Sequence, residues 1–139
     1  MTQRVRVPRG MLAAVAAMAV AVGSACSSSG STNPGLTAAE LVGTYSLVSI
    51  TLGATPPLGP PDATGTLTLN TSTYSVTLNL PSGEQQDSGT WSVNGTTWTQ
   101  SSSVQPIQEQ GTVSLSHDTL SVNLNAAGTA ISNVWVKQQ

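Results

Sequence analysis

Charged residues and cysteine are scarce in this 139-residue sequence, and phenylalanine is absent. Only 7% of the residues are charged, against ~25% in typical globular proteins. A single cysteine excludes a disulfide framework, and the single histidine leaves too little material for a Cys/His metal cluster or a catalytic triad. We therefore expect a protein with no enzyme activity, no metal and no cofactor.

Positive charge is almost confined to the start of the chain. Three of the four basic residues are Arg4, Arg6 and Arg9, and the fourth is Lys137. All six acidic residues follow residue 26. After removal of the N-terminal segment, the chain would have one basic and six acidic residues, a net charge of −5. No basic patch is then left to neutralise phosphates, and nucleic acid is excluded as an expected partner.

Residues 1–25 are typical of a secretory signal peptide. The arginine-rich start is followed by twelve apolar residues, Met11–Val22, and then by the small residues Gly23-Ser24-Ala25. An apolar run of this length is too short to span a hydrocarbon core about 30 Å thick, but it suits the apolar region of a secretion signal. Cleavage after residue 25 would place Cys26 at the new N-terminus.

The phrase Ser24-Ala25-Cys26 resembles the end of a bacterial lipoprotein signal, in which the cysteine receives lipid. The resemblance implies a lipid anchor on Cys26 and a place in the bacterial cell envelope, at the outer membrane, its periplasmic side or the cell surface. An ordinary cleavage site with an incidental cysteine is the alternative. Residues 26–37 are nearly all Ser, Thr, Gly, Asn and Pro and predict a flexible tether to a folded domain over 38–139.

That domain is expected to be all-β. Serine and threonine make up close to a third of the chain after residue 25, a composition that favours strands and turns. One helical turn is predicted at Thr37–Val42, where Glu40 stands three residues after a capping threonine. Alternating apolar residues then predict eight strands. They are 44–52, a strand with Leu67 and Leu69, 74–80, a strand ending with Trp91 and Val93, 96–100, 112–116, 119–124 and 131–136.

Short turns between consecutive strands favour an eight-stranded antiparallel up-and-down barrel, with an immunoglobulin-like sandwich as the alternative. The apolar parity changes at Leu47-Val48, which indicates a bulge in the first strand. The pair Asn94-Gly95 predicts a type I′ hairpin turn.

The phrases Leu41–Ser49 and Gly89-Thr90-Trp91 are similar to the opening G-x-W strand and the later G-T-W strand of lipocalin-like domains. Tyr45 stands where lipocalins place tryptophan, and Lys137 matches the basic residue that closes the family's barrel base. The resemblance covers residues 38–139 and implies a monomeric lipocalin-like barrel that binds a small molecule.

Aromatic residues are the candidate ligand-binding side chains, because they could line a barrel cavity. The candidates are Tyr45, Tyr74, Trp91 and Trp98. We expect an envelope lipoprotein that binds a small uncharged apolar molecule; the alternative is a structural or protein-interaction module whose barrel is filled by its own side chains. His117 is expected to be a solvated turn residue, and Glu84 and Asp87, three apart on a strand, are expected on opposite faces.

Overall fold

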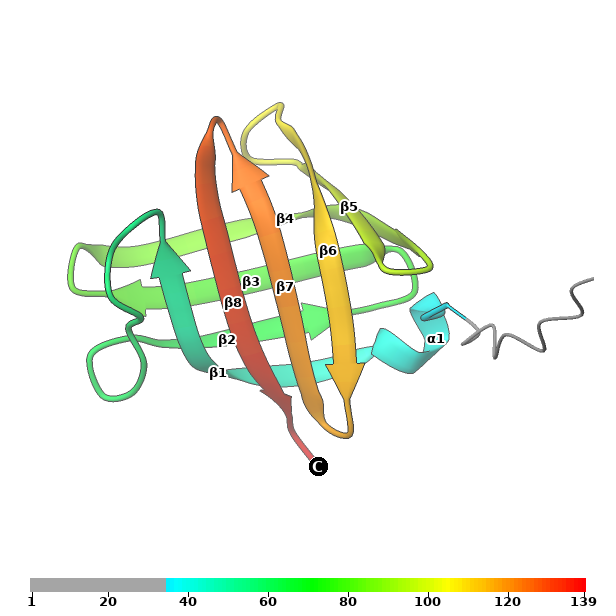
Figure 1. Ribbon diagram of the computed structural model, residues 1–139, viewed down its shortest axis with the longest axis horizontal. Coiled ribbons are helices and arrows are strands. Elements are labelled where there is room, and N and C mark those ends of the chain that lie inside the picture. The colour runs from blue at the N-terminus through cyan, green and yellow to red at the C-terminus, as the bar shows by residue number, and fades with distance from the viewer. Residues whose placement is uncertain (1–34) are drawn as a thin grey trace, which may run out of the picture. The chain divides into compact units, whose positions relative to one another are not determined.

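The computed structural model describes residues 35–139, which form one closed barrel of eight antiparallel strands (Figure 1). The strands pair in chain order, and the first pairs with the last. Their bounds are β1 Gly43–Leu52, β2 Thr64–Leu69, β3 Thr73–Leu80, β4 Gly83–Asn94, β5 Thr97–Ser102, β6 Gln108–Ser116, β7 Thr119–Ala126 and β8 Thr129–Lys137. The predicted up-and-down barrel is confirmed, and the pairing of β1 with β8 excludes a sandwich of two sheets.

The one helix of the described residues, α1 (Ala38–Leu41), precedes β1 as the sequence predicts. The carboxylate of Glu40 accepts hydrogen bonds of 2.7 Å from both the backbone N–H and the hydroxyl of Thr37. These two bonds stabilise the ionised carboxylate and lower the pKa of Glu40. No helix within residues 35–139 has the length and apolar character needed to cross a membrane.

Two irregularities of the strands bear on the sequence predictions. The register of β1 against β8 shifts between Leu47 and Ser49, which confirms the predicted bulge. The type I′ prediction at Asn94-Gly95 is wrong, because only Gly95 has a positive φ there (63°). A type I′ turn needs positive φ at both central residues, and it occurs instead at Ala127 (49°) and Gly128 (85°), between β7 and β8.

The barrel has two ends that differ in their connections. At one end, which we call the helix end, α1 leads into β1 and the turns β2–β3, β4–β5 and β6–β7 are short. The connections β1–β2, β3–β4, β5–β6 and β7–β8 lie at the other end, the loop end, and include the two longest. Figure 1 shows α1 beside the former and the long β1–β2 connection away from it.

Large buried side chains fill the helix end. The largest side chains that are fully buried are Trp98, Tyr45, Leu41, Leu69 and Leu120. The rings of Trp91 and Trp98 stack with centroids 4.8 Å apart and planes 15° from parallel. The hydroxyl of Tyr45 donates a 2.7 Å hydrogen bond to the carbonyl of Leu41, so the helical turn is tied to this core. The expected basic residue is also here, since the Lys137 ammonium lies 5.8 Å from the centroid of the Tyr45 ring.

Predictions about the N-terminal segment fall largely outside the described residues. The signal peptide over 1–25, the lipidated Cys26 and most of the tether lie there. Only the last three tether positions, 35–37, are described. Among these, Leu36 forms an isolated bridge with Gly95 and packs against the barrel core.

Candidate functional site

The barrel contains a cavity of about 220 Å³, which we call the loop-end cavity. Its wall extends from the loop end to Tyr74, Trp98 and Trp135, which border the helix-end core. Most of its wall is aliphatic or aromatic, contributed by Ile50, Leu52, Leu67, Tyr74, Val76, Leu78, Leu80, Trp98, Val122, Leu124, Ile131 and Trp135. Polar groups of the wall are Gln85, Asp87, Gln100, Glu109 and Asn133. A mostly apolar wall with a few placed polar groups is the usual composition of a small-molecule pocket.

Asp87 of β4 is held by three donors at the mouth of this cavity. Its Oδ2 accepts a 2.6 Å hydrogen bond from the hydroxyl of Tyr74. Its Oδ1 accepts bonds of 2.5 Å from the hydroxyl of Ser102 and 2.8 Å from the backbone N–H of Ser88. An ionised carboxylate only accepts hydrogen bonds, so three donors and no acceptor around Asp87 fit its charged form.

Glu109 of β6 is positioned through the neighbouring strand β5. The indole N–H of Trp98 donates to the side-chain oxygen of Gln100 at 2.9 Å. The amide nitrogen of Gln100 then donates to the Glu109 carboxylate at 2.6 Å. Gln100 and Glu109 are Cα partners across β5 and β6, which explains how the sheet register aligns them. The relay turns the amide of Gln100 so that its donor faces the acid.

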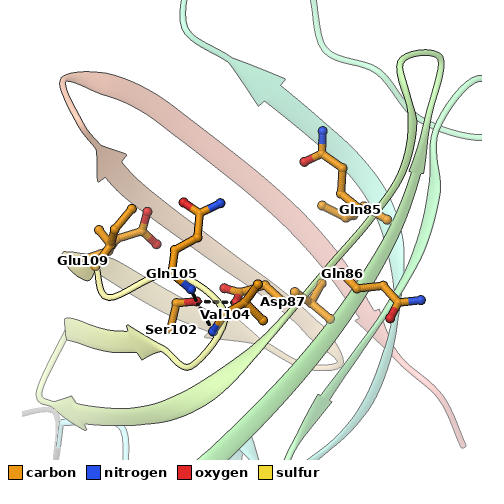
Figure 2. Close-up of a pocket in the computed structure, with 10 residues that line it drawn as sticks. Gln85, Gln86, Asp87, Ser102, Val104, Gln105 and Glu109 are labelled. Carbon is orange, nitrogen blue, oxygen red and sulfur yellow. Dashed lines mark hydrogen bonds between the residues drawn. The ribbon is translucent and has the colours of Figure 1, made fainter.

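A second pocket of about 180 Å³ adjoins the cavity and shares Asp87 and Glu109 with it (Figure 2). The β5–β6 connection forms part of its wall, with Val104 63% and Ile107 39% exposed. Ser102 anchors the start of that connection: its Oγ accepts from the backbone N–H groups of Val104 (3.1 Å) and Gln105 (3.0 Å) while donating to Asp87. Figure 2 shows these bonds converging at Ser102 beside Asp87.

The field at the mouth is negative. The pKa of Tyr74 is raised, first by burial and then by its hydrogen bond to Asp87 and by the charges of Asp87 and Glu109. Within residues 35–139 the only lysine or arginine is Lys137, which sits at the helix end over Tyr45. The two carboxylates therefore have no cationic side chain beside them in the described part of the chain.

The four aromatic candidates divide into two pairs. Tyr74 and Trp98 line the cavity. Tyr74 donates a hydrogen bond directly to Asp87, whereas Trp98 donates to Gln100, which in turn donates to Glu109. Tyr45 and Trp91 are not part of the lining, because they are packed in the helix-end core. The Trp91 indole N–H donates to the backbone carbonyls of Asn70 (3.0 Å) and Thr73 (3.1 Å), so its polar atom faces the β2–β3 turn.

The remaining polar candidates lie where the sequence expects them. His117 is exposed in the turn between β6 and β7, at the helix end. Glu84 is exposed and accepts a hydrogen bond from Gln86, whereas Asp87 faces the cavity, so these two acids are on opposite faces of β4. The described residues contain no group of three or more His, Cys, Asp or Glu placed to hold a metal ion.

The sequence analysis did not predict most of the polar residues of the cavity wall. These residues lie in polar parts of their strands, where apolar and polar residues do not alternate: Gln85, Gln100, Glu109 and Asn133. The available signal is weak: Gln85 and Asp87 keep the inward parity that the later Trp91 and Val93 of the same strand define.

Comparison with one solved structure agrees with this architecture. A lipocalin-like protein from Bacteroides uniformis superposes with a TM-score of 0.51 at 16% identity, over 71% of this chain and 99% of that one. An uncharacterized protein from Bacteroides eggerthii gives a TM-score of 0.48 at 11% identity, over 70% of this chain and 98% of its own. No family model and no curated protein matches the sequence. The domain has a lipocalin-like fold, as its sequence resemblance predicts.

Proposed function

We propose that the barrel binds a small molecule with an apolar body in its loop-end cavity. The observation that supports this most directly is the cavity of about 220 Å³ with its mostly apolar wall. Protein cores are close-packed, and an apolar cavity of ~150 Å³ is already large enough to take up benzene. A barrel with only a structural or protein-interaction role would gain more stability from filling this space, so the cavity favours binding over the filled-barrel alternative.

The wall also limits the charge of the bound molecule. The aliphatic and aromatic part of the wall suits a ligand with an uncharged body, as the sequence analysis expects. Asp87 and Glu109 oppose an anion, since an unpaired negative charge beside them would be both desolvated and repelled. Hydrogen-bond donors on the guest fit better, because the polar atoms that face it include two carboxylates. The proposed role is binding without catalysis.

The protein's place in the cell is a separate part of the proposal, and it rests on the sequence. The arginine-rich start, the apolar run and the lone cysteine support secretion and a lipid on Cys26. A lipid anchor followed by a polar tether would hold a binding domain close to a membrane of the cell envelope. The barrel would then take up its ligand near that surface.

Calorimetric titration with 1-naphthylmethanol, an uncharged probe with a bicyclic apolar body, tests the binding role. The full chain would carry Cys26→Ser so that no lipid competes for the probe. Ile131→Trp would fill the cavity from β8, and Val136→Trp, exposed on the outer face of the same strand, is the matched control. We expect saturable binding to the parent and to the control and none to Ile131→Trp. Absence of binding to the parent, or binding unchanged by Ile131→Trp, would refute the proposal.

A further inference from the structure

Two acidic side chains at the mouth of the cavity are held in place by hydrogen bonds. Asp87 is fixed by three hydrogen-bond donors, and Glu109 is fixed by the relay through Gln100 from Trp98. Both side chains line the cavity and the second pocket that adjoins it. The chain is poor in charge, with 7% charged residues, yet two of its six acids face one cavity.

Like charges that share a partly buried site repel each other and lose hydration, a cost that a nearby cation would offset. The described residues do not supply that cation, because Lys137 lies at the opposite end of the barrel. The four strands β3 to β6 that surround the acids contribute Tyr74, Ser102, Gln85 and Gln100 as polar neighbours, none of them basic. The site therefore lacks a positive partner on the protein side.

The wall of the same cavity contains a buried hydrogen-bond acceptor without a partner in residues 35–139. The side-chain oxygen of Asn133 on β8 is inaccessible and has no hydrogen-bond partner among the described residues. Asn133 contributes to the cavity wall together with the two acids. Buried polar atoms are nearly always hydrogen-bonded, so an acceptor left over in a binding cavity points to a donor on the ligand.

From these groups we propose that the ligand of the loop-end cavity is an organic ammonium ion: a small protonated amine whose N–H groups bind Asp87 and Glu109 and whose apolar body fills the barrel. This rests on the binding role proposed above and names the chemical class of the ligand. An ammonium offers up to three donors to the two carboxylates. The aliphatic wall of Val76, Leu78 and Leu124 then accommodates a hydrocarbon or aromatic body.

A bare metal ion fits the site less well. Calcium takes six to eight oxygen ligands, and magnesium requires near-octahedral oxygen coordination. The described residues bring no third carboxylate to this mouth, and most of the wall beyond it is apolar. An apolar wall gives nothing to a metal ion, whereas it contributes directly to the affinity for an amine with an apolar body.

Three probes that share one body distinguish charge from shape: 1-naphthylmethylamine, 1-naphthylmethanol and 1-naphthoate. We expect the full chain with Cys26→Ser to bind the amine roughly tenfold more tightly than the alcohol at neutral pH and low salt, and to bind the naphthoate least. Glu109→Gln and the double variant Asp87→Asn/Glu109→Gln should reduce the ratio of amine to alcohol affinity stepwise, because each substitution removes one negative charge from the cavity. The matched charge control is Asp62→Asn/Asp118→Asn, in exposed positions outside both pockets.

The outcomes separate this inference from the binding role. If the alcohol binds as tightly as the amine, or more tightly, the ammonium assignment is overturned and the binding role stands. An amine preference that remains at its parental size in the double variant Asp87→Asn/Glu109→Gln with parental melting behaviour also overturns it. The same holds if the control double variant removes the preference equally. If none of the probes binds the parent, both the binding role and the ammonium assignment fail.

Discussion

The hydroxyl of Tyr74 donates a 2.6 Å hydrogen bond to Asp87, and the two residues come from adjacent strands of the barrel. The direct Cα partner of Tyr74 is Gly89, so the bond to Asp87 runs diagonally across the strand pair. It joins an aromatic wall residue of the cavity to an acid at its mouth. The phenol thus serves the site through its oxygen as well as through its ring.

The two tyrosines should ionise at a higher pH in the folded protein than in the unfolded chain. The pKa of each is raised above the ordinary tyrosine value of about 10, chiefly by burial. A raised pKa favours the neutral phenol in the folded state, so this stabilisation is complete below about pH 10 and is lost as the pH rises further. Ultraviolet titration at pH 10 should show less tyrosinate in the folded protein than in the unfolded chain. One tyrosine ionising near pH 10 while the barrel remains folded would contradict the buried positions.

Gly89 should not tolerate a side chain. A Cβ at this position would clash with the backbone carbonyl of Ser101 on β5. We expect Gly89→Ala to lower the free energy of unfolding by about 1–3 kcal/mol, because the adjoining backbone must shift. Urea unfolding measures the loss, and Thr90→Ala at the exposed neighbouring position is the control. Equal effects of the two substitutions would show that β4 and β5 are not so closely apposed.

The stacked tryptophans should have different roles. Trp91→Phe removes the donor to the carbonyls of Asn70 and Thr73 and should reduce stability by about 1 kcal/mol without changing probe affinity. Trp98→Phe frees Gln100 and should weaken binding of 1-naphthylmethylamine by roughly three- to tenfold. Calorimetry and thermal melting of both variants check this. A larger loss of affinity in Trp91→Phe would place the ligand at the helix end instead.

Cys26→Ser should release the protein from membranes. The signal-like segment before this residue supports lipid attachment at its thiol, and no other cysteine is present. Fractionation should find the variant in the soluble extracytoplasmic fraction, and Ser28→Ala, two residues further on, should remain with the membranes. Membrane association of Cys26→Ser equal to that of the parent would exclude the lipid anchor.

The sequence predicts the architecture well because the barrel interior is mostly apolar. Alternation of leucine, valine and aromatic residues marks the inward face of each strand, and the parity change at Leu47-Val48 locates the bulge. The capping pair Thr37 and Glu40 locates the helical turn. Each of these signals is local, so a single sequence contains it.

The polar mouth of the cavity could not be predicted in the same way. Inward positions near Gln85 and Glu109 are polar, so hydrophobic alternation ends there although β4 and β6 continue. The proximity of Asp87 to Ser102 and of Gln100 to Glu109 depends on the register of three strands, which no short motif encodes. The turn at Asn94-Gly95 also differs from its prediction, because Asn94 pairs with Thr97 and the central turn residues are Gly95 and Thr96.

The most direct test of the account locates a bound probe inside the barrel. In the full chain with Cys26→Ser and labelled methyl groups, nuclear Overhauser contacts would be recorded from the ring protons of bound 1-naphthylmethanol. The account predicts contacts to the methyl groups of Val76, Leu78, Leu124 and Ile131, which line the loop-end cavity, and none to the helix-end residues Leu41 and Leu69. Contacts confined to the exposed methyl groups of Val48 and Val136 at a saturating probe concentration would contradict it.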